Sequence, residues 1–167
     1  KYGWDLYGID PAQNLRASSE EKGINTFINF FGSDVIEFGT KFDVITALNV
    51  FAHVPNPLKF LRECKKNLTK TGVIFIQTSQ RDMIEKRQFD TVYHKHISFF
   101  SVKSMQAICK RAGLYLNDIK LSDIHGGSYV FCISKENKTT STVPERIAHE
   151  EGSGRYSTNM SCPPYFV

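Results

Sequence analysis

Apolar positions along the chain follow two patterns: short continuous runs, and positions spaced three or four residues apart. Four continuous runs have the length of buried strands, and they cover residues 6–9, 25–31, 42–48 and 73–76. The run Phe42–Leu48 is the strongest of these signals, with apolar residues at most of its positions. Such near-continuous apolar character predicts a strand that is covered on both faces, as in a parallel sheet.

Three segments between or after these runs carry the start and stop signals of helices. Each begins after a residue that can cap a helix N-terminus and ends at a glycine, which readily adopts the left-handed conformation. The start and stop residues are Asp10 and Gly23, Asn56 and Gly72, and Ser101 and Gly113.

The order of these elements predicts a doubly wound α/β sheet that ends in an antiparallel hairpin. The hairpin strands are expected at residues 115–121 and 128–134, around a turn at His125-Gly126-Gly127. After Glu136 the chain becomes polar and loses its periodicity. We therefore expect a partial catalytic domain over residues 1–135. Residues 136–167 are expected to form a tail or the start of a truncated C-terminal region.

Composition and charge narrow the classes of function. Hydrophobic residues make up 41% of the 167 positions, charged residues 23%, and the net charge is +4. No basic stripe interleaved with aromatic residues is present, which argues against nucleic-acid binding. The four cysteines form no CxxC pair, so neither a structural zinc site nor a disulfide framework is expected. No apolar run approaches the roughly 20 residues of a membrane span. A cytoplasmic protein is expected, and its oligomeric state is left open.

Four polar side chains follow directly after predicted strands: Asp10, Asn49, His53 and Ser79. Doubly wound sheets bind their ligands at the carboxyl ends of the strands, so these residues are expected to share one rim. An acidic residue at the position of Asp10 can accept hydrogen bonds from the ribose of a nucleotide-type cofactor, or it can simply cap the helix that follows. His53 can likewise be an ordinary loop histidine.

The cluster Tyr93-His94-Lys95-His96 concentrates groups that can transfer protons. Imidazole titrates near neutrality and can therefore accept a proton at working pH. The alternative interpretation is a set of solvated polar residues in the approach to a helix. For His125, a hairpin turn with an incidental histidine is the stronger interpretation.

Four stretches together resemble the S-adenosylmethionine-dependent sugar C-methyltransferases. They are FDVITALNVFAHVPNPLKFLRE, TGVIFIQTS, FDTVYHKHISFFS and HGGSYVFCIS, and the similarity covers about Leu6 to Ser134. The resemblance implies a class I methyltransferase fold. It also implies methyl transfer to the ring carbon next to the keto group of a nucleotide-linked deoxysugar.

The resemblance also implies roles for individual residues. His96 would be the base that removes the carbon-bound proton, while Tyr93 and His53 would orient the substrate or stabilise the enolate oxygen. Asp10 and Asn49 would contact the S-adenosylmethionine cofactor, and His125 and Ser79 the substrate.

Lys95 departs from the family, which usually has glutamate at this position. An ammonium group cannot polarise a neighbouring imidazole as a carboxylate does, although it can pair with an enolate or with a diphosphate. The base assignment to His96 is therefore retained, and Lys95 is counted with the catalytic cluster. Since the chain begins at Lys1 rather than methionine, we also expect the first strand of the sheet and its Gly-rich cofactor loop to lie upstream.

Three alternatives remain. The first is a class I methyltransferase in which the histidines deprotonate a hydroxyl or an amine. The second is a non-catalytic remnant that binds a sugar nucleotide or a partner protein. The third is a nicotinamide-dependent enzyme, because the position of Asp10 fits that class equally well.

Overall fold

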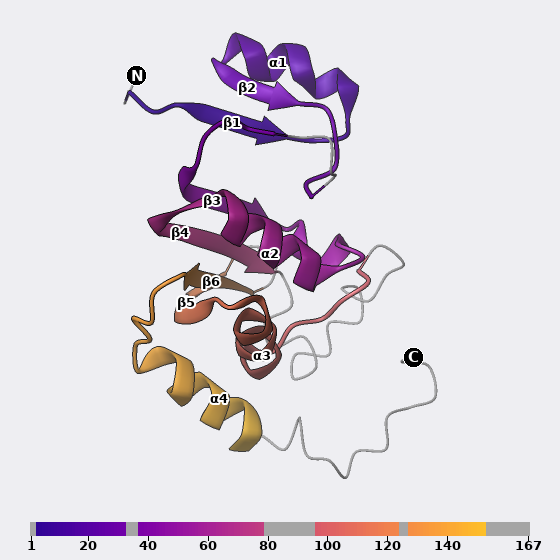
Figure 1. Ribbon diagram of the computed structural model, residues 1–167. Coiled ribbons are helices and arrows are strands. Elements are labelled where there is room, and N and C mark those ends of the chain that lie inside the picture. Colours follow the sequence, from indigo (N-terminus) through magenta and orange to yellow (C-terminus); the bar gives the residue numbers. More distant parts are fainter. Residues whose placement is uncertain (1–2, 33–36, 79–95, 124–126, 153–167) are drawn as a thin grey trace. The chain divides into compact units, whose positions relative to one another are not determined.

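The computed structural model describes residues 3–32, 37–78, 96–123 and 127–152 (Figure 1). The chain divides into two compact units, Lys1–Thr40 and Lys41–Val167, and each is treated by itself.

The first unit is a parallel β-α-β arrangement. Strand β1 (Leu6–Ile9) pairs in parallel with β2 (Ile24–Phe27), with Leu6 opposite Ile24. Between them lie a 3-10 turn, η1 (Gln13–Leu15), and helix α1 (Arg16–Glu21). Gly23 has a φ of 75° and allows the chain to turn from the helix into β2. Both predicted strands and the helix are present, although β2 and α1 are shorter than expected.

Asp10 does not cap a helix, which corrects one of the two interpretations of this residue. Its Oδ1 accepts a hydrogen bond from the backbone N–H of Ala12, 2.8 Å away. The residue that precedes the 3-10 turn is Ala12, and it makes no side-chain cap. The carboxylate therefore closes a short turn at the end of β1, as aspartate commonly does in loops.

The second unit is built on a four-stranded sheet of order β3-β4-β6-β5. Strand β3 (Phe42–Leu48) is parallel to β4 (Leu68–Thr78). Strand β6 (Ser128–Ser134) is antiparallel to both β4 and β5 (Tyr115–Ser122). The predicted α/β fold that ends in an antiparallel hairpin is confirmed.

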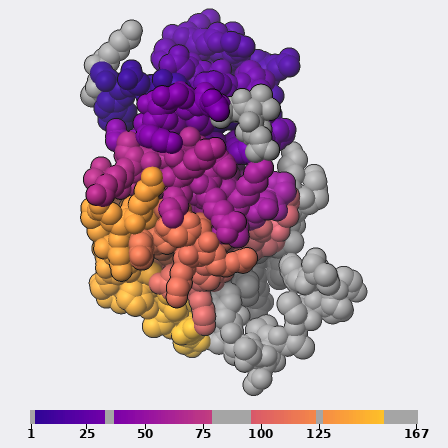
Figure 2. Space-filling view, in the orientation of Figure 1, coloured from indigo at the N-terminus to yellow at the C-terminus, as the bar shows by residue number. Residues whose placement is uncertain are grey.

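Among the described residues, three α-helices accompany this sheet: α2 (Pro57–Asn67), α3 (Val102–Ala112) and α4 (Thr142–Gly152). Helix α3 packs against both α2 and α4, and in the space-filling view orange segments separate the magenta part of this unit from the yellow α4 (Figure 2). Apolar residues with no exposed surface fill this core: Leu61, Ile74, Ile76, Met105 and Phe131.

Helices α2 and α3 start where the sequence predicted. The Asn56 side chain accepts a hydrogen bond from Lys59 N–H at the start of α2. Ser101 and Ser104 exchange side-chain-to-backbone hydrogen bonds in a capping box at the start of α3. Gly113 ends α3 with a φ of 71°.

Gly72 does not end α2, contrary to the prediction. The helix ends at Asn67, and Gly72 lies inside β4. A Cβ atom at this position would lie 2.8 Å from the Leu68 side chain and 2.9 Å from the carbonyl oxygen of Phe42. Glycine is therefore required by the close approach of β3 and β4 rather than by a helix end.

Strand β3 is not covered on both faces within its unit, although its composition predicted this. It is the edge strand of the four-stranded sheet, and the side chains of Val44 and Leu48 are 57% and 56% exposed. The segment after Glu136 contains a helix that the sequence did not predict. It includes α4, whose Val143 and Glu150 side chains are buried, and residues 136–152 belong to the same unit as the sheet.

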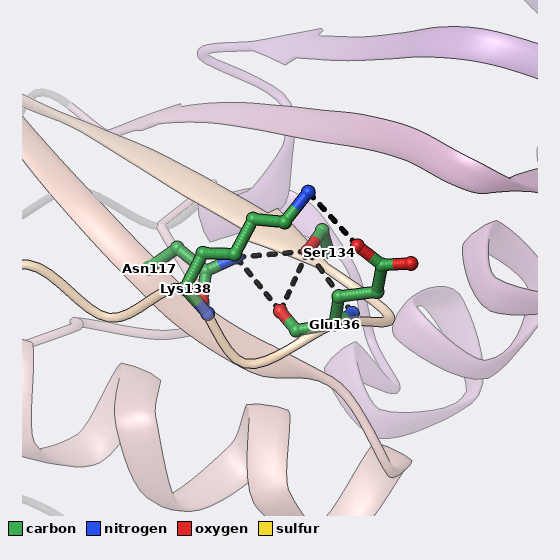
Figure 3. Close-up of polar contacts among 4 residues, drawn as sticks. All are labelled: Asn117, Ser134, Glu136 and Lys138. Atoms are coloured by element: carbon green, nitrogen blue, oxygen red, sulfur yellow. Dashed lines mark hydrogen bonds and ion pairs between the residues drawn. The ribbon is translucent and has the colours of Figure 1, made fainter.

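A buried polar network ties the segment after β6 to the sheet (Figure 3). Asn117 is the extra residue of a bulge in β5, where the pairing with β6 shifts between Leu116 and Asp118. Its amide nitrogen donates to Ser134 Oγ at 2.8 Å and to the carbonyl oxygen of Glu136 at 3.0 Å. Its amide oxygen accepts from the backbone N–H of Lys138 at 2.9 Å. The bulge thus directs a side chain that holds the following loop.

The thiols of Cys64 and Cys109 are buried, and burial raises the pKa of the Cys109 thiol to about 12. In the described parts of the chain, no helix has the length and apolar character needed to cross a membrane.

Candidate active site

Four of the eight predicted site residues lie within the described residues: Asp10, Asn49, His53 and His96. The other four, Ser79, Tyr93, Lys95 and His125, lie outside the described residues. Their predicted roles stay predictions.

His53 and His96 lie face to face. The centroids of their rings are 4.8 Å apart, and the ring planes differ by 24°. Both residues are half-buried, so the pair remains accessible to a ligand. The two imidazoles to which the resemblance gives roles on one substrate therefore lie side by side, and the roles themselves stay predictions.

The position of His53 follows from the way β3 ends. Asn49 comes directly after the strand and adopts a left-handed conformation with a φ of 55°, which asparagine tolerates better than most residues. Its backbone N–H donates to the carbonyl oxygen of Gln77 in β4. The chain then forms a 3-10 turn, η2 (Phe51–His53), which lies against β4. This turn places His53 at the carboxyl end of the parallel strands.

His96 reaches the same place through backbone hydrogen bonds. The N–H groups of Ile97 and Ser98 both donate to the carbonyl oxygen of Ala52, at 2.9 and 3.1 Å. We call residues 96–100 the histidine strap. Because Ala52 immediately precedes His53, the two hydrogen bonds bring the start of the strap beside the His53 ring.

Aromatic packing holds the other end of the histidine strap. The Phe100 ring lies 4.7 Å from the ring of Phe51, which is fully buried and also contacts Phe60 of α2 edge-on. Within the strap, the edge of Phe99 meets His96 with centroids 6.2 Å apart. The site is therefore anchored to the core through Phe51 and Phe100, next to the histidine pair.

Three buried polar atoms at the ends of β3 and β4 have no hydrogen-bond partner among the described residues. They are Asn49 Oδ1, Gln77 Nε2 and Thr78 Oγ1. Gln77 and Thr78 were not among the candidate residues that the sequence indicated. The available signal was the change from the apolar run Val73–Ile76 to two polar residues at the carboxyl end of the same strand.

Asp10 belongs to the first unit, at the carboxyl end of β1. One carboxylate oxygen accepts from Ala12 N–H, and Oδ2 has no hydrogen-bond donor among the described residues. The Asp10 side chain thus keeps an acceptor that can receive a ribose hydroxyl, which fits a nucleotide-type cofactor.

This arrangement can carry out proton transfer. A neutral imidazole of the pair can accept a proton from a carbon or a heteroatom, while a second imidazole can donate a hydrogen bond to an oxygen on which charge develops. Proton transfer of this kind suits an enzyme in which a nucleophile must be generated before it reacts.

Comparison with known proteins identifies the class. The model of the methyltransferase domain family matches residues 1–118. The chain belongs to this family. Its α/β sheet is that of the class I methyltransferases, as predicted.

The names of two relatives give different methyl acceptors, carbon in one protein and oxygen in the other. The C-methyltransferase NovU of Streptomyces niveus is 28% identical over 157 residues, which are 89% of this chain and 37% of NovU. A ubiquinone biosynthesis O-methyltransferase of Actinobacillus pleuropneumoniae serotype 7 is 33% identical over 93 residues, covering 50% of this chain and 40% of that protein. The chain thus spans about two-fifths of the length of these relatives.

A solved structure shows the same fold. It is that of magnesium protoporphyrin IX methyltransferase from Synechocystis PCC 6803 with bound SAH, and its TM-score is 0.60 at 9% sequence identity. The match covers 80% of this chain and 65% of the methyltransferase chain. Family and fold together identify S-adenosylmethionine as the cofactor, as the sequence predicted.

Proposed function

We propose that this chain is the catalytic part of an S-adenosylmethionine-dependent C-methyltransferase. Its acceptor would be the carbon next to the keto group of a nucleotide-linked deoxysugar. The stacking of His96 on His53 carries the proposal, because it places a proton acceptor beside a second imidazole at the carboxyl edge of the sheet. The similarity to NovU over 89% of the chain supports the choice of carbon as the acceptor atom.

In the proposed reaction His96 removes the proton from the carbon α to the carbonyl, and the electron pair of that bond forms an enolate. S-adenosylmethionine would supply the methyl group: its sulfur–methyl bond would break as the enolate carbon bonds the methyl carbon, and S-adenosylhomocysteine would leave with the electron pair of the broken bond. His53 and Tyr93 would hold the enolate oxygen by hydrogen bonds. Lys95 adds positive charge on the same segment and would pair with the enolate or with the substrate diphosphate.

Two residues of the chain are proposed to hold the cofactor. The acceptor Oδ2 of Asp10 suits a ribose hydroxyl, and Asn49 follows directly after strand β3, at the carboxyl end of that strand. Ser79 and His125 are proposed to contact the sugar nucleotide.

Hydrogen exchange at the acceptor carbon tests the base assignment. The full-length protein is incubated in D2O with SAH and a nucleotide-linked keto-deoxysugar, so that exchange proceeds without methyl transfer. We expect deuterium to enter at the carbon next to the keto group, and His96→Ala to slow this exchange by about 10²-fold or more. His149→Ala is the matched control, because His149 is exposed on α4. An unchanged exchange rate in His96→Ala contradicts the assignment.

An O-methyltransferase is the second candidate, and the 33% identity to the ubiquinone O-methyltransferase favours it. In that reaction the histidines would deprotonate a hydroxyl. The same experiment separates the two functions, because a hydroxyl acceptor gives no deuterium wash-in at carbon. Titration calorimetry with S-adenosylmethionine tests the third possibility, a non-catalytic remnant, for which no binding heat is expected at millimolar ligand.

A further inference from the structure

The carboxyl end of β4 contains a polar pair that the fold does not use. Gln77 is 7% exposed and Thr78 is 1% exposed, and neither Gln77 Nε2 nor Thr78 Oγ1 has a hydrogen-bond partner among the described residues. A buried polar group without a partner costs free energy comparable to a lost hydrogen bond, and native structures contain few of them.

The same sheet satisfies its other buried polar side chains. Asn117 and Ser134 are about as deeply buried as Gln77, and both are fully engaged with each other and with the following loop (Figure 3). Unsatisfied groups are therefore not a general property of this sheet. They are concentrated where β3 and β4 end, with Asn49 Oδ1 as the third such atom.

This location is that of the histidine pair. The turn η2, which carries His53, lies against β4, and Asn49 N–H binds the carbonyl oxygen of Gln77. Gln77 and Thr78 are the last two residues of β4, so their side chains point to opposite faces of the sheet. A ligand that lies across the end of the strand can meet both.

The chemistry of the two groups specifies what they can bind. The amide nitrogen of Gln77 is a donor and needs an acceptor atom, and the Thr78 hydroxyl can donate or accept. Neither group is charged. An uncharged site of this kind suits carbonyl and hydroxyl oxygens of a small molecule.

We propose that Gln77 and Thr78 are substrate-binding residues that hydrogen-bond oxygens of the methyl acceptor. Gln77 donates to one oxygen, and Thr78 binds a second oxygen at the same end of β4. The inference rests on the proposed function only for the description of the acceptor as an oxygen-rich keto-sugar.

Two near-isosteric substitutions, Thr78→Val and Gln77→Met, test the inference in the full-length protein. Because each removes a buried group that lacks a partner, we expect the Tm of the ligand-free protein to stay the same or rise. We expect the KM for a nucleotide-linked keto-deoxysugar to increase about tenfold or more, since each variant loses a hydrogen bond to the substrate. SAH affinity, measured by calorimetry, should stay within about twofold.

Ser134→Ala is the control, because it removes a buried hydroxyl that does have partners and should lower the Tm. A comparable loss of Tm in Thr78→Val and Gln77→Met would overturn the inference, since it would show that both groups support the fold. Weakened SAH binding with an unchanged acceptor KM would also overturn it, in favour of a cofactor contact. Failure of the proposed function is a different result: wild-type protein would show no deuterium wash-in, whatever the Tm values of the variants.

Discussion

The imidazole rings of His53 and His96 stack with a centroid distance of 4.8 Å, although they belong to segments far apart in the sequence. Main-chain atoms produce this contact, because the carbonyl oxygen of Ala52 accepts hydrogen bonds from both Ile97 and Ser98. The geometry of the pair therefore depends on backbone donors in the histidine strap as much as on the histidines.

Replacing Ile97 with proline tests this dependence. Proline removes the N–H that donates to Ala52 and also restricts the backbone of His96. We expect a stability loss of about 1 kcal/mol and a fall in kcat/KM of about 10- to 100-fold, because the ring of His96 shifts. Ile97→Ala is the control: the side chain is 59% exposed, and the variant keeps the N–H. Equal activity of the two variants would show that the hydrogen bond does not position His96.

Glu150 and Glu151 provide a matched comparison on α4. Both carboxylate oxygens of Glu150 accept from Val102 N–H at 3.1 Å, at the start of α3, and the side chain is 3% exposed. We expect Glu150→Ala to lower the free energy of unfolding by about 1–3 kcal/mol, because a buried N–H at a helix N-terminus loses its acceptor.

The neighbouring Glu151 forms an exposed ion pair with Lys103. Its replacement by alanine should cost no more than about 1 kcal/mol. Urea-induced unfolding followed by circular dichroism measures both variants, and similar losses in the two would contradict the capping role of Glu150.

Asn117 is expected to be the most sensitive polar position of the hairpin. Asn117→Ala leaves Ser134 Oγ, Glu136 O and Lys138 N without their shared partner, which should reduce stability by about 1–3 kcal/mol. Lys138→Ala removes only the exposed ion pair with Glu136 and keeps the backbone N–H, so a change of at most about 1 kcal/mol is expected. Thermal unfolding of the two variants decides, and equal Tm values would argue against the network.

The carboxyl group of Asp118 should make stability depend on pH in the acid range. The hydrogen bond from Thr142 lowers the pKa of Asp118, and one from Thr140 adds to the effect. Because the pKa is lower in the folded state than in the unfolded chain, the stabilisation is present above the ordinary aspartate pKa of about 4. It is lost as the pH falls through the folded value.

Replacing Thr142 with valine should therefore raise the pKa of Asp118 toward its ordinary value. An NMR titration of the carboxyl carbon measures the shift, and the stability difference from wild type should vanish in acid. Thr139→Val serves as the control because the Thr139 hydroxyl donates to Leu116 and Asn137 and not to Asp118. A Thr142→Val titration curve identical to that of wild type would refute the assignment.

The elements that sequence predicted correctly have strong local signals. The strand Phe42–Leu48 has exactly the predicted bounds, and the cap residues Asn56 and Ser101 fix the starts of their helices. His53 was placed at the carboxyl edge of the sheet because it follows a predicted strand, whereas His96 was linked to the same substrate through the family resemblance.

The elements that were missed have a weak or misleading local signal. Helix α4 buries the side chain of Glu150, although a glutamate in a polar stretch of sequence is expected to be exposed to solvent. Gly72 resembles a helix stop, because only the structure shows how closely β3 and β4 approach there. For Gln77 and Thr78 the change from apolar to polar residues at the end of β4 is only a weak signal, because the absence of a hydrogen-bond partner is a property of the packed structure.

The carbonyl oxygen of Ala52 accepts its two hydrogen bonds from the backbone of Ile97 and Ser98, not from their side chains. Since main-chain donors dock the histidine strap, the side chain at position 97 can be changed to any residue other than proline in a combinatorial library without disturbing the anchor. Such a library would explore which acceptors the enzyme tolerates while the imidazoles stay in register.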